Sequence, residues 1–181
     1  QPDILVLRTE KHLGEGILKK VAGFCNVDLD CVIQSEDLTS IYEVPINMQN
    51  QGLDTAILKT MGEPVTEKPT LGPWRKFLER REKAVEEVHI GLVGKYDLQD
   101  AYKSIRESLS QAGTYNDHKT VLTFINSENL TEGNVAEALK GQDGIVICPG
   151  FGQRGTEGKI IATHYARIND LPCFGICLGM Q

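Results

Sequence analysis

The sequence predicts an α/β protein in which parallel βαβ units carry helices on both faces of a sheet. Two observations lead to this prediction. From residue 88 onward, short apolar runs alternate with amphipathic segments of helical periodicity, which is typical of parallel strands joined by crossover helices. Residues 62–73, rich in proline and glycine, separate this regular half from a less regular first part, so we expect two domains joined by a linker.

The elements of the first part are expected to be short. Apolar runs predict buried strands, and apolar residues spaced three to four apart predict helices. Pro45 must interrupt or begin a helix, because proline lacks the backbone N–H and has a fixed φ. We expect strands at residues 3–7 and 30–33, helices at residues 15–24 and within residues 40–58, and a polar turn at residues 34–37.

The elements of the second part alternate in type. We expect helices at residues 74–87, 101–111, 131–140 and 157–168, and strands at residues 89–93, 119–125, 144–148 and 173–176. This alternation predicts a parallel sheet covered by helices. In such sheets ligands bind beyond the carboxyl ends of the strands, and two glycine-rich segments of this sequence lie there.

The composition excludes several classes of protein. The 181 residues are 40% hydrophobic and 24% charged, which is ordinary for a globular chain. A net charge of −6 argues against sequence-independent binding to nucleic acid. No apolar stretch approaches the ~18 residues of a membrane span. Five cysteines without a CxxC pair fit neither a disulfide framework nor a zinc knuckle, so we expect a cytoplasmic protein with reduced thiols. The chain begins without a signal peptide or an initiating methionine, and we expect it to be part of a longer protein.

A G-x-C-x-G motif at residues 175–179 follows the last expected strand. It is the thiol form of the nucleophile elbow, a turn so tight that only glycine fits on either side of the nucleophile. The Cys177 sulfur would stand beyond the sheet edge, and the Leu178 N–H would face an oxyanion formed on an attacked carbonyl. The alternative interpretation is a buried cysteine beside glycines that serve only packing.

A second glycine-rich segment, residues 148–155, also lies between an expected strand and an expected helix. Its backbone N–H groups can face an anion, although a glycine-rich turn required only by geometry is the alternative. Together the two segments supply a nucleophile and a second oxyanion donor at one sheet edge. This arrangement suits acyl transfer through a thioester.

A catalytic thiol needs a base, which in elbow enzymes is a histidine that follows the nucleophile in the chain. The histidines all precede Cys177, and they are His12, His89, His118 and His164. We assign the base to none of them and expect it beyond Gln181.

Several motifs resemble those of one enzyme family. Residues 174–181, Phe-Gly-Ile-Cys-Leu-Gly-Met-Gln, resemble the nucleophile segment of class I glutamine amidotransferases. Further motifs resemble the CTP synthases specifically, in the same order and along essentially the whole chain. They lie at residues 1–5, 24–27, 40–45, 93–96, 100–104, 150–155, 157–159 and 165–167.

The resemblance implies a domain organisation and a reaction. Residues 1–62 would form the C-terminal part of an α/β synthetase (amidoligase) domain, residues 63–87 a linker, and residues 88–181 the N-terminal half of a Rossmann-like glutamine amidotransferase domain. In the family, ATP with Mg²⁺ phosphorylates UTP, and ammonia released from L-glutamine displaces the phosphate to give CTP. GTP activates the glutaminase step, CTP inhibits as the product, and the enzymes are homotetramers.

The resemblance also implies roles for individual residues. Cys177 would be the nucleophile, with the Gly150 and Leu178 N–H groups on the glutamine carbonyl. The remaining glutamine-binding positions would be Phe151, Gly179, Met180 and Gln181. Lys20 would lie near the triphosphate of UTP or CTP, and Glu36, Asp37 and Leu38 at the adenine of ATP. From the residues alone, Lys20 is equally well a solvated lysine on a helix, and the acidic turn a helix cap. No metal ligand is expected within the chain.

One departure from the family pattern concerns the oxyanion loop. The family has two glycines before the phenylalanine, whereas this chain has Pro149-Gly150, and proline has no N–H to donate. The phosphate-binding loop, the magnesium ligands and the catalytic base are expected outside these residues, so we expect the chain alone to be inactive. Two alternatives remain open at this stage. One is another class I amidotransferase that supplies ammonia to a different acceptor, and the other is a non-catalytic binding or assembly module.

Overall fold

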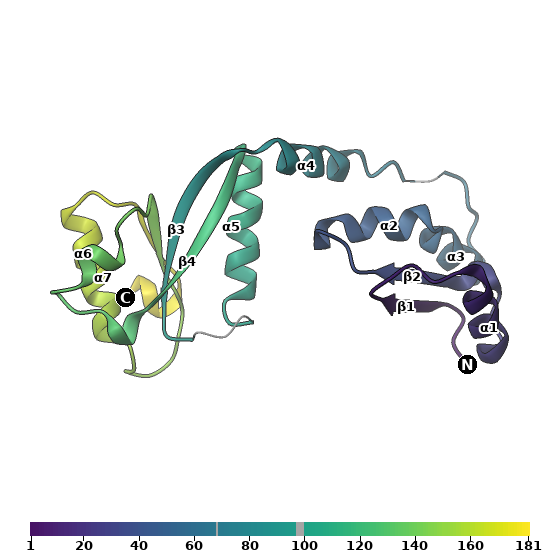
Figure 1. The fold of residues 1–181 in the computed structure, drawn as a ribbon, viewed down its shortest axis with the longest axis horizontal. Helices are drawn as coiled ribbons and strands as arrows, with labels where there is room; N and C mark the ends of the chain where they lie inside the picture. Colours follow the sequence, from purple (N-terminus) through teal and green to yellow (C-terminus); the bar gives the residue numbers. More distant parts are fainter. Residues whose placement is uncertain (68, 97–99) are drawn as a thin grey trace. The chain divides into compact units, whose positions relative to one another are not determined.

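The computed structural model describes residues 1–67, 69–96 and 100–181. The chain forms two compact units, residues 1–78 and residues 79–181 (Figure 1). None of the helices within the described ranges is long and apolar enough to cross a membrane.

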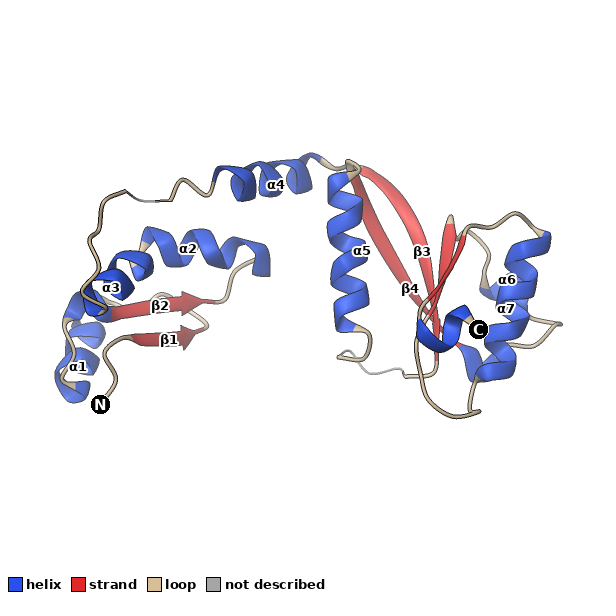
Figure 2. Cartoon of the chain, turned by 180° about the vertical axis from the view of Figure 1, so that it is seen from behind, coloured by secondary structure: helices blue, strands red, loops and turns tan. Residues whose placement is uncertain are grey.

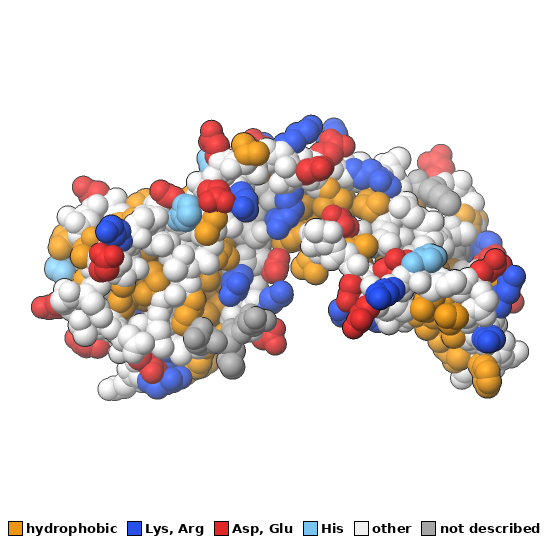
Figure 3. Space-filling model, in the orientation of Figure 1, with side chains coloured by type: hydrophobic (Ala, Val, Ile, Leu, Met, Phe, Trp, Pro, Cys, Tyr) orange, Lys and Arg blue, Asp and Glu red, His pale blue; other side chains and the backbone are white. Residues whose placement is uncertain are grey.

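The first unit is built on a two-stranded parallel sheet (Figure 2). Strand β1 (Leu5–Thr9) pairs with β2 (Val32–Glu36), so that Leu5 lies opposite Val32 and Thr9 opposite Glu36. The helices of this unit are α1 (Glu15–Cys25), α2 (Val44–Asn50) and α3 (Leu53–Thr60). Pro45 occupies the first turn of α2, as the sequence predicts. Hydrophobic side chains remain exposed on β1 and α1, among them Val6, Ile17 and Phe24 (Figure 3).

The polar turn expected at residues 34–37 is wrong, because β2 continues to Glu36. Gln34 is buried, with 4% of its surface exposed, yet its polar groups are hydrogen-bonded. Its side-chain oxygen accepts from the Leu13 N–H at 2.7 Å, and the Gln51 amide bonds both the N–H and the C=O of Gln34 at 2.7 and 2.6 Å. A polar residue satisfied in this way can occupy a buried strand.

Helix α4 (Gly72–Lys83) carries an aromatic cluster at its beginning. Trp74 and Phe77 stack with centroids 5.2 Å apart, and both pack against Tyr42. The Trp74 indole N–H donates to the Tyr42 carbonyl at 2.7 Å. The helix was expected to run to residue 87, and this is wrong. Val85 is exposed, and strand β3 begins at Glu86.

The second unit confirms the predicted fold class. Its sheet is parallel in the order β4-β3-β5-β6. The strands are β3 (Glu86–Gly94), β4 (His118–Asn126), β5 (Gly144–Ile147) and β6 (Cys173–Gly175). The helices are α5 (Lys103–Tyr115), α6 (Val135–Ala138) and α7 (Thr156–Ile168).

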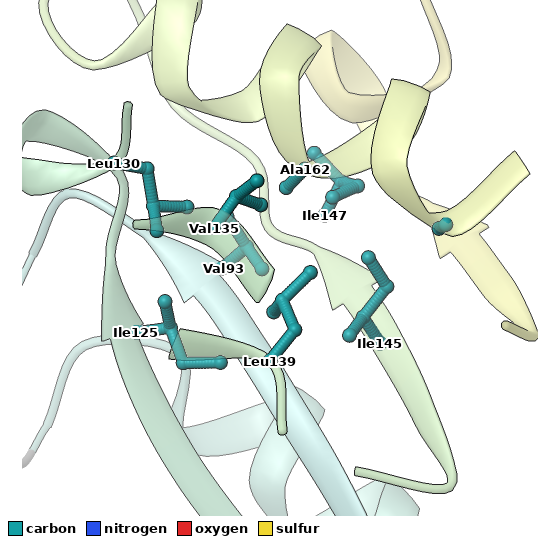
Figure 4. Close-up of a cluster of buried hydrophobic side chains, with 9 residues drawn as sticks. Val93, Ile125, Leu130, Val135, Leu139, Ile145, Ile147 and Ala162 are labelled. Atoms are coloured by element: carbon teal, nitrogen blue, oxygen red, sulfur yellow. The ribbon is translucent and has the colours of Figure 1, made fainter. Parts of the chain in front are cut away.

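Helices cover both faces of this sheet. On one face, Leu92 and Val146 pack against Ile105 and Leu109 of α5. On the other face, the strand residues Val93, Ile125, Ile145 and Ile147 meet side chains of α6 and α7 (Figure 4). Neighbouring residues of β5 therefore face opposite layers, as the alternation of a parallel strand requires.

Several element boundaries differ from those expected. Helix α6 begins at Val135 rather than residue 131, because the Asn134 side-chain oxygen accepts the Thr131 N–H at 2.8 Å and stabilises a turn there. His118, which precedes the strand expected at residues 119–125, is the first residue of β4 and lies opposite Glu86.

Candidate active site

The two glycine-rich segments meet at one edge of the second unit's sheet. Strands β5 and β6 pair with Ile147 opposite Gly175, so the residues that follow leave the sheet as neighbours. The Ile176 N–H donates to the Ile147 carbonyl at 3.1 Å and extends the pairing by one residue. The expectation that both segments share the carboxyl edge is confirmed by this register.

The turn at Cys177 has the geometry of a nucleophile elbow. Cys177 has a φ of 56°, a left-handed conformation that costs a non-glycine residue energy and occurs often at functional sites. A β-carbon on Gly175 would overlap the Gly179 carbonyl, and one on Gly179 would overlap the Ile147 carbonyl. Only glycine fits at either position, and the Cys177 side chain is exposed.

Two backbone donors next to this turn are open. Gly150 is buried, and neither its N–H nor the Leu178 N–H donates a hydrogen bond to any other residue of the described ranges. Buried backbone N–H groups are almost always paired in folded proteins. Open donors at the positions expected to meet an oxyanion are therefore consistent with a binding role.

The loop around Gly150 is held by side chains that bond its carbonyl groups. The Lys159 ammonium donates to the Cys148 carbonyl at 2.7 Å, and the Tyr102 hydroxyl to the Pro149 carbonyl at 3.3 Å. The Lys95 ammonium donates to the Phe151 carbonyl. Sequence reasoning did not assign a role to any of these three side chains.

Burial controls the ionisation of groups around this loop. It raises the pKa of the Cys148 thiol to about 11, although nearby Lys159 partly opposes the shift. It also lowers the pKa of the Lys159 ammonium and raises the pKa of the Tyr102 hydroxyl. Each shift disfavours the charged form, as expected for groups removed from water.

A pocket of about 580 Å³ lies beside the elbow. One wall is the face of α7 that carries Lys159, Thr163 and His164, and the other is formed by residues 178–181. Leu178, Gly179, Met180 and Gln181 all line it, whereas Phe151 is exposed and lies outside its lining.

The histidines have other partners. His12 lies 2.7 Å from Glu36, and His89 and His118 lie near Glu87 and Glu86, respectively. His164 lines the pocket on α7, and its Nδ1 lies 3.3 Å from a guanidinium nitrogen of Arg167.

The nucleotide-binding residues predicted in the first unit fall into two places. Glu36, Asp37 and Leu38 follow one another at the carboxyl end of β2, where the Asp37 N–H donates to the Thr9 carbonyl at 2.9 Å. Lys20 is exposed on α1. Across residues 1–67, 69–96 and 100–181, no group of three or more His, Cys, Asp or Glu side chains is placed to hold a metal ion.

Both parts of the chain are similar to known protein families. Residues 1–62 match the model for the CTP synthase N-terminus, and residues 97–181 match the model for class-I glutamine amidotransferases. The CTP synthase of Bacteroides thetaiotaomicron is 66% identical over 183 residues, which covers 100% of this chain and 34% of the relative. That of Porphyromonas gingivalis is 59% identical over 182 residues, with the same coverage. The chain belongs to the CTP synthase family.

The chain spans about a third of the length of the CTP synthases that it matches. The enzyme of Flavobacterium johnsoniae is 49% identical over 180 residues, which is 99% of this chain. A solved structure, the glutaminase domain of Trypanosoma brucei CTPS with bound acivicin, is 37% identical and covers 52% of this chain and 38% of that one, with a TM-score of 0.49.

Lys159 could have been found from the sequence of this CTP synthase segment. Within α7, Lys159, Ala162 and Ala166 are buried and follow the i, i+3, i+7 spacing of a core-facing stripe. A lysine at the first position of such a stripe must have a hydrogen-bond partner.

Proposed function

We propose that this chain carries the glutamine-hydrolysing nucleophile of a CTP synthase, Cys177. One observation carries the proposal. Cys177 has a left-handed backbone between two glycines that no larger residue can replace, at the end of a strand paired with the one that leads to Gly150. Packing alone does not require a cysteine in this strained conformation.

In this mechanism the Cys177 thiolate attacks the carboxamide carbon of glutamine. A sulfur–carbon bond forms, and the carbonyl electron pair moves to the oxygen, which accepts hydrogen bonds from the open Gly150 and Leu178 N–H groups. The carbon–nitrogen bond then breaks, and the nitrogen leaves as ammonia after it takes a proton. Water hydrolyses the thioester to glutamate and restores the thiol.

The base for this reaction is proposed to lie outside the 181 residues. Among the histidines of the second unit, His89 and His118 lie in the amino-terminal halves of β3 and β4, away from the carboxyl edge that carries Cys177, which supports their exclusion. His164 is the remaining candidate because it lines the pocket beside the elbow. Replacement of His164 by Asn in the full-length protein should leave ammonia release within about threefold, whereas the loss of a general base costs roughly 10²–10⁴-fold.

The activity of the whole protein is proposed from its family. We propose a ligase of pyrimidine biosynthesis in which ATP with Mg²⁺ activates UTP and ammonia from L-glutamine converts it to CTP. GTP would activate the glutaminase step, CTP would inhibit it as the product, and the protein would act as a cytoplasmic homotetramer. The match of residues 1–62 to the CTP synthase N-terminus supports this acceptor over that of another amidotransferase.

Finer assignments belong to the same proposal. Residues 1–62 would end the synthetase domain, residues 63–87 would form the linker, and residues 88–181 would begin the glutaminase domain. Phe151, Gly179, Met180 and Gln181 would contact glutamine. Lys20 would lie near the nucleotide triphosphate, and Glu36, Asp37 and Leu38 near the adenine of ATP.

The test is ammonia release from glutamine by the full-length protein, its Cys177→Ala variant and the 181-residue chain. The full-length protein should be active, and both the variant and the short chain should be inactive. A Cys177→Ala variant that still releases ammonia would disprove the assignment of the nucleophile. An active short chain would show that the base lies within it.

A further inference from the structure

The orientation of one peptide group decides whether the Gly150 N–H can meet an oxyanion. This N–H belongs to the same peptide unit as the Pro149 carbonyl, and none of the peptide bonds in the described part of the chain is cis. In a trans peptide the N–H and the C=O point in opposite directions. Any side chain that fixes the Pro149 carbonyl on one side therefore fixes the Gly150 N–H on the other.

Tyr102 bonds this carbonyl. Its hydroxyl donates to the Pro149 oxygen at 3.3 Å and accepts the Lys95 backbone N–H at 3.3 Å, which directs the hydroxyl proton toward Pro149. Both bonds are long, as hydrogen bonds in ligand-free catalytic sites often are. They are expected to shorten when a carbonyl oxygen occupies the other side of the loop.

The backbone around Tyr102 is adapted to this contact. Tyr102 has a φ of 61°, a strained conformation for an aromatic residue. Its ring lies against Gly94 at the end of β3, where an added β-carbon would stand 2.8 Å from the Tyr102 hydroxyl oxygen. The strained backbone of Tyr102 thus places its ring against Gly94, which has no side chain. This position brings the Tyr102 hydroxyl to the Pro149 carbonyl.

Two buried ammonium groups complete the arrangement. A β-carbon on Gly150 would lie 3.5 Å from the Lys159 Nζ and 3.7 Å from the Lys95 Nζ, so both cations lie close to Gly150. Lys159 is 4% exposed and Lys95 is 5% exposed. Neither forms an ion pair with a carboxylate within the described ranges.

Such burial of unpaired positive charge costs free energy unless another group compensates for it. Lys159 donates to the Cys148 carbonyl and Lys95 to the Phe151 carbonyl, on either side of the Gly150 peptide, and the Lys95 ammonium also lies 5.4 Å from the centroid of the Tyr96 ring. An oxyanion bound to the Gly150 N–H would bring negative charge to this place, in a low-dielectric setting where the attraction is strong.

We propose that Tyr102, Lys95 and Lys159 are positioning residues of the glutamine-hydrolysing site, which fix the peptide planes of the oxyanion loop so that the Gly150 N–H is held ready to donate. The proposal rests on the proposed function. These side chains should stabilise the transition state more than they stabilise bound glutamine, because the carbonyl of bound glutamine carries less negative charge than the oxyanion.

The decisive variant is Tyr102→Phe in the full-length protein, because it removes one oxygen atom and keeps the ring. The kcat for ammonia release should fall roughly 5- to 50-fold, less than the 10²–10³-fold cost of removing an oxyanion donor. The KM for glutamine should stay within about twofold, since the loss falls on the transition state. Lys159→Met and Lys95→Met should likewise lower kcat and leave KM nearly unchanged. Tyr165→Phe and Lys140→Met are matched controls, which should change neither kcat nor KM.

A second measurement excludes a merely structural role. The aldehyde analogue of glutamine adds the Cys177 sulfur to its carbonyl carbon and places a tetrahedral oxygen at the loop. Its affinity should fall in each variant by about the same factor as kcat/KM, whereas the affinity for glutamate should not change. If Lys159→Met fails to fold, Tyr102→Phe alone decides. The proposal is wrong if kcat and aldehyde affinity stay unchanged, or if the loss appears in KM alone.

The proposed function is tested by a different variant from those that test the positioning role. A Cys177→Ala variant that still releases ammonia would disprove it whatever the Tyr102 and lysine variants do. An inactive Cys177→Ala together with an unaffected Tyr102→Phe would leave the nucleophile assigned and the positioning role disproved.

Discussion

The Lys159 ammonium donates to the carbonyl of Cys148 at 2.7 Å, which ties the first turn of α7 to the residue that follows β5. The Cys148 thiol lies in the same buried environment, and burial raises its pKa to about 11. Cys148 and Cys177 therefore differ sharply in access, because the Cys177 side chain is exposed.

This difference predicts an order of reaction with a thiol reagent. At pH 8, iodoacetamide should modify Cys177 first and Cys148 only after unfolding, since the thiolate is the reacting species and a buried thiol is both protonated and shielded. Mass spectrometry of peptides from a time course measures the order. Cys173 is an internal control, because it is exposed but burial of its thiol raises the pKa. Early modification of Cys148 in the folded chain would contradict the structure.

The elbow should not tolerate a methyl group at Gly179. The added carbon of Gly179→Ala would overlap the Ile147 carbonyl, so the turn must shift. We expect a loss of about 1–3 kcal/mol in the free energy of unfolding. In the full-length protein, glutaminase activity should fall by about 100-fold or more because the open Leu178 N–H moves with the turn. Gly133→Ala is the matched control, since the nearest atom to its added carbon lies 3.9 Å away. Equal behaviour of the two variants in urea denaturation and in activity would refute this account.

Gln51 should be a stability determinant of the first unit. Gln51→Leu leaves the buried N–H and C=O of Gln34 without partners. The expected cost is about 2–4 kcal/mol, the desolvation penalty of two unpaired polar groups. Gln49→Leu, which removes an exposed bond to the Pro69 carbonyl, should cost about 0.5 kcal/mol or less. Denaturant titration followed by Trp74 fluorescence measures both, and a change of less than 0.5 kcal/mol in Gln51→Leu would argue against the role.

Arg80 should control the ionisation of Asp117. The guanidinium bonds both carboxylate oxygens, one of them at 2.8 Å, and these hydrogen bonds hold the pKa of Asp117 below its ordinary value. A lowered pKa in the folded state stabilises the fold above the pKa of the unfolded chain, and this contribution is lost as the pH falls through the folded value. In Arg80→Met, an NMR titration should show the pKa of Asp117 shifted upward. Glu87, whose pKa Lys119 lowers, should titrate as before.

The regular part of the fold could be predicted because its apolar residues lie in apolar surroundings. The run that contains Leu92 and Val93 faces two apolar layers, so its hydrophobicity identifies it as a buried parallel strand. The steric demand at Gly175 and Gly179 could also be predicted, since the motif itself implies a tight turn.

The remaining features depend on partners distant in the chain. Gln34 is polar, and it suits a buried strand because the Leu13 N–H bonds its side chain and the Gln51 side chain, 17 residues away, bonds its backbone. Glu86 and Glu87 extend β3 because they lie opposite His118 and Lys119 of β4 rather than because of their own propensity. Tyr102 meets Pro149 across 47 residues, and no local pattern predicts such a contact.

The left-handed backbone at Cys177 has a consequence for protein engineering. Glycine adopts this conformation without strain, so Cys177→Gly should be more stable than Cys177→Ala by about 1 kcal/mol, although both variants lose the thiol. Selection for thermal tolerance alone would then favour the loss of the nucleophile. A stabilised version of this domain should therefore be sought among substitutions remote from the elbow, since the trade-off between robustness and turnover is greatest at this residue.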